Sequence, residues 1–132
     1  MKRQGAAEVV MAKVLVVDDE YAIVETIIDV LESQGYECLA ASNGREALDC
    51  ARQERPDLVV MDVMMPVMDG TEALSEMTED PELASIPVIL MSAAPDAVAV
   101  DAFAGRELTF LKKPFDLRVF LQAVAAWVGD PP

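Results

Sequence analysis

Five polar residues of this sequence stand directly after short apolar runs, where they could share one reactive site. They are Asp18, Asp19, Asp62, Ser92 and Lys113. Three carboxylates held close together repel one another, so at least one would take up a proton unless a cation lies among them. Magnesium suits a site with few carboxylates and several waters. A lysine ammonium and a hydroxyl beside such a cation can hold a phosphoryl group as it arrives on a carboxylate oxygen.

Each of these residues has a simpler explanation when it is taken alone. Paired aspartates after a strand often cap the following helix, where the helix dipole favours a negative charge. Asp62 could be an ordinary turn residue and Ser92 a helix cap, and a Lys-Pro pair says little by itself. Only their joint placement favours a functional site. Whether they lie together depends on the strands and helices that would position them.

Short apolar runs alternate with amphipathic stretches along the chain. The runs predict strands at Val14–Val17, Glu37–Ala41, Leu58–Met61, Val88–Met91 and Leu108–Leu111. Between and after them, helical spacing predicts five helices. These are a helix through Ile23, Ile27, Val30 and Leu31 closed by Gly35, one through Ala47, Leu48 and Ala51 before Pro56, one near Thr71–Met77, an Ala-rich one over about Asp96–Ala104, and a last one whose buried stripe is Leu117, Leu121, Val124 and Val128.

This alternation predicts one α/β domain. Strands that are apolar on both sides and separated by helices form a parallel sheet covered on both faces. Right-handed crossovers then bring the C-terminal ends of all strands to the same edge, where ligands of open α/β sheets bind. The five polar residues would therefore crowd one site.

Composition limits the possible functions. The chain has 132 residues, 53% of them hydrophobic, with a net charge of −14 and no histidine. The negative charge argues against binding to nucleic acid. The absence of histidine excludes histidine-based catalytic triads and histidine-ligated zinc. Cys38 and Cys50 are expected to be reduced, buried small hydrophobes. No apolar run approaches a membrane span and no signal peptide is evident, so a cytoplasmic protein is expected. Residues 1–11 are expected to be an extension, disordered or partly ordered, and residues 12–129 the domain.

Four segments resemble the CheY-like receiver domain of bacterial two-component response regulators. They are VLVVDDE at 14–20, PDLVVMDVMMPVMDG at 56–70, PVILMSA at 87–93 and FLKKPF at 110–115. The resemblance covers about residues 12–128, and the second segment carries Pro66 and Gly70 at the spacing of the family. It implies a flavodoxin-like, doubly wound five-stranded parallel sheet of (βα)5 topology, with strand order 2-1-3-4-5.

The resemblance also implies a metal site around the phosphoacceptor, Asp62. Asp19 and Asp62 would bind Mg²⁺, or Mn²⁺ in its place, together with the backbone carbonyl of Met64. Asp18 would act through a metal-bound water.

Further residues would bind the phosphoryl group and change conformation when it is bound. Ser92 and the backbone amide of Ala93 would bind phosphoryl oxygens, and Lys113 would pair with the group, aimed by a cis peptide bond to Pro114. Ser92 and Phe110 would form the switch, in which the hydroxyl moves inward and the aromatic ring follows. Phe110 could equally be a plain core aromatic.

By this resemblance the protein is a signalling switch rather than a turnover enzyme, and it stands alone or is part of a larger regulator. It would take a phosphoryl group from a sensor histidine kinase or histidine phosphotransfer protein. The face formed by the fourth helix, fifth strand and fifth helix would pass the change to a downstream effector protein or domain, with no direct contact to nucleic acid or membrane. One alternative is a degenerate receiver that acts only as an interaction module. A second alternative is an aspartyl-phosphate phosphohydrolase, although such an enzyme needs a second acid where this chain has Met64.

Several side chains depart from the family pattern or invite a second interpretation. Met64 and Ala94, two residues after Asp62 and Ser92, cannot hydrogen-bond the water that hydrolyses an acyl phosphate, which predicts slow phosphate loss. Met61, Met64, Met65 and Met68 could suggest a soft-metal site, but core and loop packing explains them better. Trp127 lies off the predicted buried stripe, so it is either a partly exposed contact or a packing residue.

Overall fold

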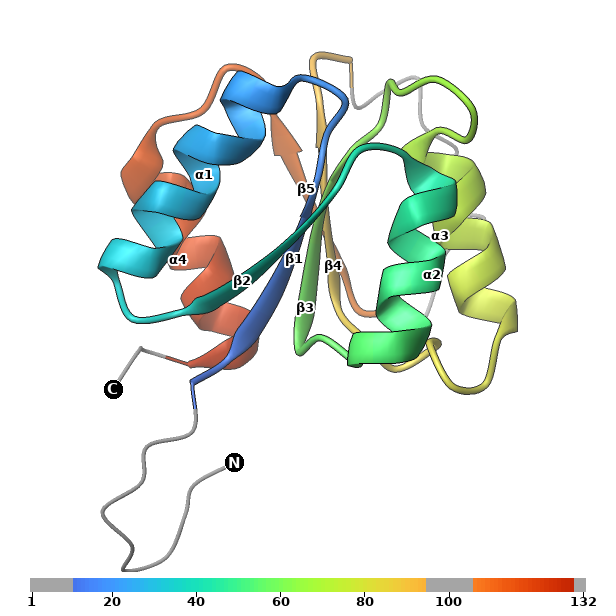
Figure 1. Ribbon diagram of the computed structural model, residues 1–132. Coiled ribbons are helices and arrows are strands. Elements are labelled where there is room, and N and C mark those ends of the chain that lie inside the picture. Colours follow the sequence, from blue (N-terminus) through green and yellow to red (C-terminus); the bar gives the residue numbers. More distant parts are fainter. Residues whose placement is uncertain (1–10, 95–105, 130–132) are drawn as a thin grey trace, which may run out of the picture.

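A five-stranded parallel sheet forms the centre of the computed structural model, which describes residues 11–94 and 106–129 (Figure 1). The strands are β1 (Lys13–Val17), β2 (Glu37–Ala41), β3 (Leu58–Asp62), β4 (Val88–Ser92) and β5 (Leu108–Lys112). They are hydrogen-bonded in the order β2-β1-β3-β4-β5, and every pair is parallel. The predicted α/β class and the predicted strand order are both confirmed.

Helices cover both faces of the sheet. They are α1 (Tyr21–Ser33), α2 (Gly44–Glu54), α3 (Gly70–Glu79) and α4 (Leu117–Val128). Figure 1 shows α1 and α4 on one face and α2 and α3 on the other. Alternate residues of β1 point to opposite sides, so Val14 and Val16 enter the core under α1 and α4, while Leu15 and Val17 enter the core under α2 and α3. The central strands β1, β3 and β4 are apolar along most of their length because both faces are buried.

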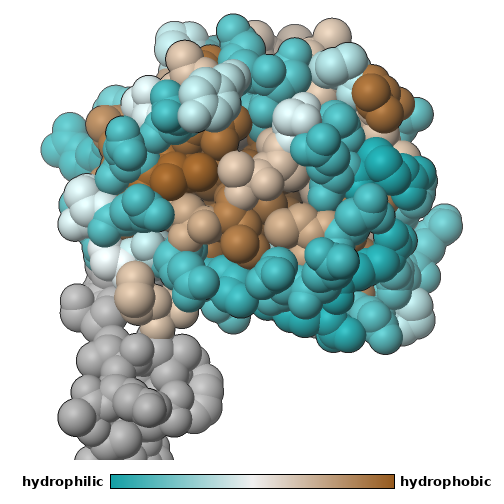
Figure 2. Space-filling view, in the orientation of Figure 1, coloured by the Kyte–Doolittle hydropathy of each residue, from teal (hydrophilic) through white to brown (hydrophobic). Residues whose placement is uncertain are grey.

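The edge strand β2 is less enclosed than the central strands. Its Cys38 and Leu39 are only partly buried. Figure 2 shows apolar surface between α1 and α2, where β2 lies, framed by hydrophilic residues. Cys38 and Cys50 are both free and half-buried. Burial raises the pKa of Cys38 to about 12, so this residue is a neutral thiol at physiological pH.

Three strands, β3, β4 and β5, run one residue further than predicted, and β1 begins one residue earlier, at Lys13. β3 includes Asp62 and β4 includes Ser92, because Asp62 is still paired with Met91 and Ser92 with Lys112. Backbone pairing does not require an apolar side chain, so the end of an apolar run marks the end of a strand only approximately. Asp62 and Ser92 are therefore held in place by the sheet itself.

Side-chain caps set where three of the helices begin. Asn43 accepts a hydrogen bond from the backbone N–H of Glu46 at the start of α2. Asp69 and Glu72 form a capping box at the start of α3, which spans residues 70–79 rather than 71–77. Asp116 accepts from the N–H of Val119 at the start of α4. At the other end of α1, Gly35 has a φ of 97°, a value that glycine adopts without steric cost.

The predicted buried stripe of the last helix is wrong in part. Phe120 and Val124 are fully buried, whereas Leu117 is 49% exposed. Leu121 and Val128 are only partly buried against the same core. The inward face of α4 contains Phe120 and Val124, which are four residues apart in the helix. Phe120 also stacks on Phe115, with ring centroids 5.8 Å apart.

Two predictions fall outside the described residues. The Ala-rich helix expected over about Asp96–Ala104 is one, and the extension expected over residues 1–11 is the other, apart from Met11. Within the two described stretches, no helix is both long and apolar enough to cross a membrane.

Candidate functional site

Three aspartates meet at the C-terminal edge of the sheet. Asp18 follows β1 and Asp62 ends β3, and these two strands are neighbours, with Val17 paired to Met61. One carboxylate oxygen from each of Asp18, Asp19 and Asp62 lies within 4.8 Å of the others. Asp18 and Asp62 are buried, and Asp19 is exposed. The sheet thus brings together the acids that the sequence placed at one edge.

Lys113 reaches this acidic cluster from the far side of β4. Its Nζ donates a hydrogen bond to Oδ1 of Asp62 over 2.5 Å, and its backbone N–H donates to the carbonyl of Ser92 over 2.9 Å. Burial alone lowers the pKa of Lys113, but the hydrogen bond and the charges of Asp62 and Asp18 outweigh it and raise the pKa. The ammonium therefore stays charged. The Lys113–Pro114 peptide bond is cis, as expected.

Asp18 is the acid that most clearly lacks a partner. Its Oδ1 accepts a hydrogen bond from the N–H of Glu20 over 2.9 Å, while its buried Oδ2 has no partner among the described residues. Burial raises the pKa of Asp18, and the neighbouring charge of Asp62 raises it further. A buried, unpartnered carboxylate oxygen beside two other acids fits a divalent cation with oxygen ligands.

Ser92 lies at the end of the strand between Asp62 and Lys113. It is 6% exposed, and its Oγ accepts a hydrogen bond from the N–H of Ala94 over 3.0 Å. An oxygen that accepts in this way keeps its own proton to donate elsewhere. Ala93 is exposed beside it, and Phe110 on β5 packs half-buried against the core under α2 and α3. This burial is compatible with both interpretations of Phe110.

The loop after Asp62 folds back onto the strand that it leaves. The N–H of Gly70 donates to the carbonyl of Val63 over 2.8 Å, and a Cβ at position 70 would lie 2.4 Å from the carbonyl oxygen of Asp62. Only glycine fits this close approach. Within the loop, Val67 has a φ of 68°, and the N–H of Met68 donates to the carbonyl of Pro66 over 2.7 Å. The sequence did not predict this tight turn.

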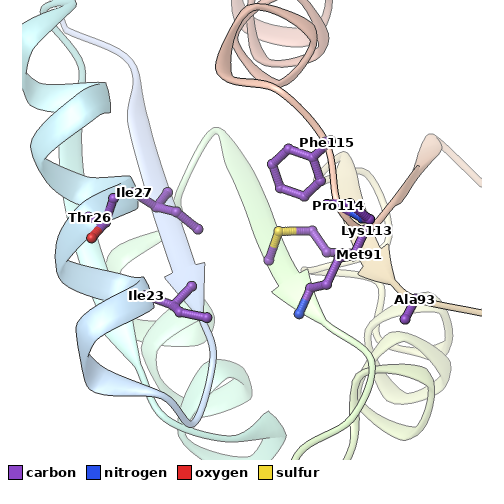
Figure 3. Close-up of a pocket in the computed structure, with 8 residues that line it drawn as sticks. All are labelled: Ile23, Thr26, Ile27, Met91, Ala93, Lys113, Pro114 and Phe115. Carbon is purple, nitrogen blue, oxygen red and sulfur yellow. The ribbon is translucent and has the colours of Figure 1, made fainter.

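An apolar groove opens beside Lys113. It has a volume of about 540 Å³ and lies between α1 and the segment after β5. In Figure 3, Ile23 and Ile27 of α1 face Met91 and Phe115 across it, and the amine of Lys113 lies near the end of β3. The residues that line it are Ile23, Thr26, Ile27, Met91, Ala93, Lys113, Pro114 and Phe115. The groove could not be predicted from the sequence, because its two walls are far apart in the chain.

The chain belongs to the response regulator receiver domains, because the sequence model of that family, "Response regulator receiver domain", matches residues 14–125. Among its relatives is the polar-differentiation response regulator DivK of Brucella anthropi. The two are 34% identical over 125 residues, which cover 89% of this chain and 96% of DivK. Receiver domains are signalling switches in two-component systems.

Solved structures agree with this assignment. The chemotaxis response regulator CheY4 of Vibrio cholerae is 32% identical, with a TM-score of 0.79, and the match covers 89% of this chain and 99% of CheY4. The receiver domain of the sensor histidine kinase PA1611 of Pseudomonas aeruginosa is 27% identical, with a TM-score of 0.77. That match covers 92% of this chain and all of the other, whose structure has a magnesium ion coordinated in the active site cleft.

Proposed function

We propose that Asp62 accepts a phosphoryl group from a phosphohistidine of a sensor histidine kinase or a histidine phosphotransfer protein. The observation that carries the proposal is the 2.5 Å contact of Lys113 with a buried Asp62 that shares its pocket with Asp18 and Asp19. A carboxylate oxygen would attack phosphorus while the bond from phosphorus to the imidazole nitrogen breaks. The electron pair returns to the imidazole, so the donor is released as free histidine.

Magnesium fits the acidic cluster, and manganese would fit by the same ligand chemistry. Asp19, Asp62 and the backbone carbonyl of Met64 would bind it, and Asp18 would act through a coordinated water. When bound, the cation would offset the charge on the carboxylates and on the phosphoryl oxygens. Both the unpartnered Oδ2 of Asp18 and the magnesium in the PA1611 receiver domain support this part of the proposal.

Three groups of the chain itself would hold the transferred phosphoryl group. The ammonium of Lys113 is already beside Asp62 and would pair with a phosphoryl oxygen. The hydroxyl of Ser92 keeps a proton to donate, because its oxygen accepts from Ala94. The backbone amide of Ala93 would donate to another oxygen. Inward movement of Ser92, followed by Phe110, would then carry the change to a downstream effector protein or domain.

The apolar groove offers a surface on which the protein donor would dock. It runs from Ile23 on α1 to Phe115 and includes Lys113, so an occupant would lie next to the phosphoacceptor. Its lining is almost entirely apolar, which favours apolar side chains of a protein over a charged small molecule. The phosphoryl group would reach the acidic pocket while the surrounding donor surface covers the groove.

Phosphorylation by acetyl phosphate tests the proposal without the natural donor. With MgCl2, intact-mass spectrometry should show one phosphoryl adduct on the wild type and none on Asp62→Asn or on protein treated with EDTA. Asp57→Asn is the matched control, because Asp57 is an exposed aspartate at the opposite edge of the sheet and its variant should label normally. Mass is a more direct readout than tryptophan fluorescence. Trp127 donates to Thr109 near the start of β5 and so lies at that opposite edge as well.

An absence of adduct on the wild type, under conditions that label another receiver domain, would contradict the proposal. It would favour a degenerate receiver that acts only as an interaction module. Continuous release of phosphate with many turnovers would instead favour a phosphohydrolase. That outcome is not expected, because Met64 supplies no acid at the position where such an enzyme needs one.

A further inference from the structure

The methionines that follow the phosphoacceptor strand differ sharply in their exposure. Met61 is fully buried, Met68 is 9% exposed and Met65 is half-buried, whereas Met64 is 76% exposed. Outside this segment, Met11 is 41% exposed, and Met77 and Met91 are buried. Met64 is thus the most exposed methionine of the described residues, and an oxidant in water would reach its sulfur first.

The segment around Met64 holds it next to the phosphoacceptor. Met64 is two residues after Asp62, and the loop closes where the N–H of Gly70 donates to the carbonyl of Val63. Met61 and Met68 are buried in the core, whereas the side chain of Met64 remains largely in solvent, two residues after Asp62. A thioether is at best a weak hydrogen-bond acceptor and cannot hold a water firmly at this place.

We propose that Met64 is an oxidation site at which a peroxide shortens the lifetime of the phosphoryl group on Asp62. This inference rests on the proposed function. Hydrogen peroxide would transfer one oxygen atom to the sulfur: the O–O bond breaks, the S=O bond forms, and water leaves. Sulfur loses the two electrons that the peroxide gains. The product is a polar sulfoxide, which methionine sulfoxide reductases can return to the thioether.

Oxidation of Met64 to the sulfoxide would change how strongly the loop can hydrogen-bond a water. Its oxygen accepts hydrogen bonds strongly, so it can hold a water close to the aspartyl phosphate, which the thioether cannot. Such a water is better placed to attack phosphorus and release inorganic phosphate. One added hydrogen bond of ordinary strength corresponds to about a fivefold faster loss of phosphate.

The test combines peptide mapping with a measurement of phosphate release. The wild type is treated with limiting hydrogen peroxide, then labelled with acetyl phosphate and Mg²⁺, freed of excess reagent and followed by intact mass. Peptide mapping should find Met64 oxidised before Met11 and before the buried methionines. The oxidised protein should lose its phosphoryl group about fivefold faster than the untreated protein, and methionine sulfoxide reductase should restore the slower rate.

Three variants separate Met64 from the other methionines, each compared with its own untreated sample. Met64→Leu cannot be oxidised there, so peroxide should leave its rate of phosphate loss unchanged. Met64→Gln, which carries an amide oxygen in place of the sulfoxide, should lose phosphate faster without any oxidant. Met11→Leu removes the next most exposed methionine and should respond to peroxide as the wild type does.

Two results would overturn the inference and leave the proposed function intact. One is preferential oxidation of another methionine while Met64 stays reduced. The other is an unchanged or slower phosphate loss once Met64 is oxidised. If the untreated wild type forms no adduct at all, the proposed function fails, and this inference fails with it.

Discussion

The surroundings of Asp18 are unfavourable to its own charge. It is 2% exposed, one of its oxygens has no partner, and Asp62 adds a second negative charge nearby. Burial and repulsion both raise its pKa, so without a cation the charged carboxylate costs folding free energy. A cation bound in the acidic pocket, as proposed, would offset this cost.

Asp18→Asn should stabilise the protein when magnesium is absent. The amide removes the buried charge and can donate to a neighbouring carboxylate, so the free energy of unfolding should rise by about 1–3 kcal/mol. The stabilisation that MgCl2 gives to the wild type should be smaller in the variant. Urea unfolding with and without MgCl2 measures both effects. Asp29→Asn, at an exposed position of α1, is the matched control and should change neither. A variant less stable than the wild type in EDTA would contradict this account.

Five candidate residues for the site could be chosen from the sequence alone. Asp18, Asp19, Asp62, Ser92 and Lys113 could be chosen because each follows an apolar run, and the sheet does bring them to one edge. The sequence did not show which acid lacks a partner or how close Lys113 lies to Asp62. Those are properties of side-chain burial and rotamer choice, which depend on neighbours distant in the chain.

At the scale of elements, strands were predicted better than the last helix. A strand buried on both faces is apolar along most of its length, so β3 and β4 were predicted to within one residue. The face of α4 was harder to predict, because Leu117, Phe120, Leu121 and Val124 are all apolar and only packing decides which turn inward. The apolar groove and the tight turn at Val67 likewise arise from contacts that no local pattern encodes.

Val67 holds the loop between β3 and α3 in a conformation that valine disfavours. Its φ of 68° lies in the left-handed region, and its side chain is 82% exposed, so packing does not offset the strain. The left-handed conformation costs a residue with a Cβ about 1–2 kcal/mol, while glycine adopts it freely.

Val67→Gly should therefore stabilise the protein by about 1 kcal/mol, after allowance for the greater freedom of glycine in the unfolded chain. Val67→Ala is the matched control: it keeps a Cβ, so most of the strain should remain and its stability should be close to that of the wild type. Urea unfolding distinguishes the two variants. Equal stability of the glycine and alanine variants would show that the turn at Val67 is not strained.

At the scale of the whole molecule, the two edges of the sheet carry different groups of residues. The acidic pocket lies at the C-terminal edge of the strands, and Trp127 lies at the opposite edge with Pro87 and Glu107. The helix pairs on the two faces pack into separate cores that meet only through the sheet. The proposed switch residues Ser92 and Phe110 lie on the neighbouring strands β4 and β5, which are paired in parallel.

The net charge of −14 is a second reason why the thermal stability of the protein should depend on ions. Exposed ion pairs such as Arg55 with Glu82 contribute little, so screening of the general repulsion should dominate. Raising NaCl from about 0.01 M to about 0.1 M shortens the Debye length from about 30 Å to about 10 Å and should raise the Tm. At matched ionic strength, MgCl2 should add a further, saturable increase through its site.

Thermal unfolding of the wild type and of Asp62→Asn separates these two contributions. NaCl should raise the Tm of both proteins, because both retain a large excess of acids, whereas the additional magnesium effect should be strong only in the wild type. The variant keeps the shape of the aspartate but loses one proposed metal ligand. A full magnesium effect in Asp62→Asn would place the cation elsewhere on the acidic surface, and a Tm that falls with NaCl would show that attraction between charges outweighs their repulsion.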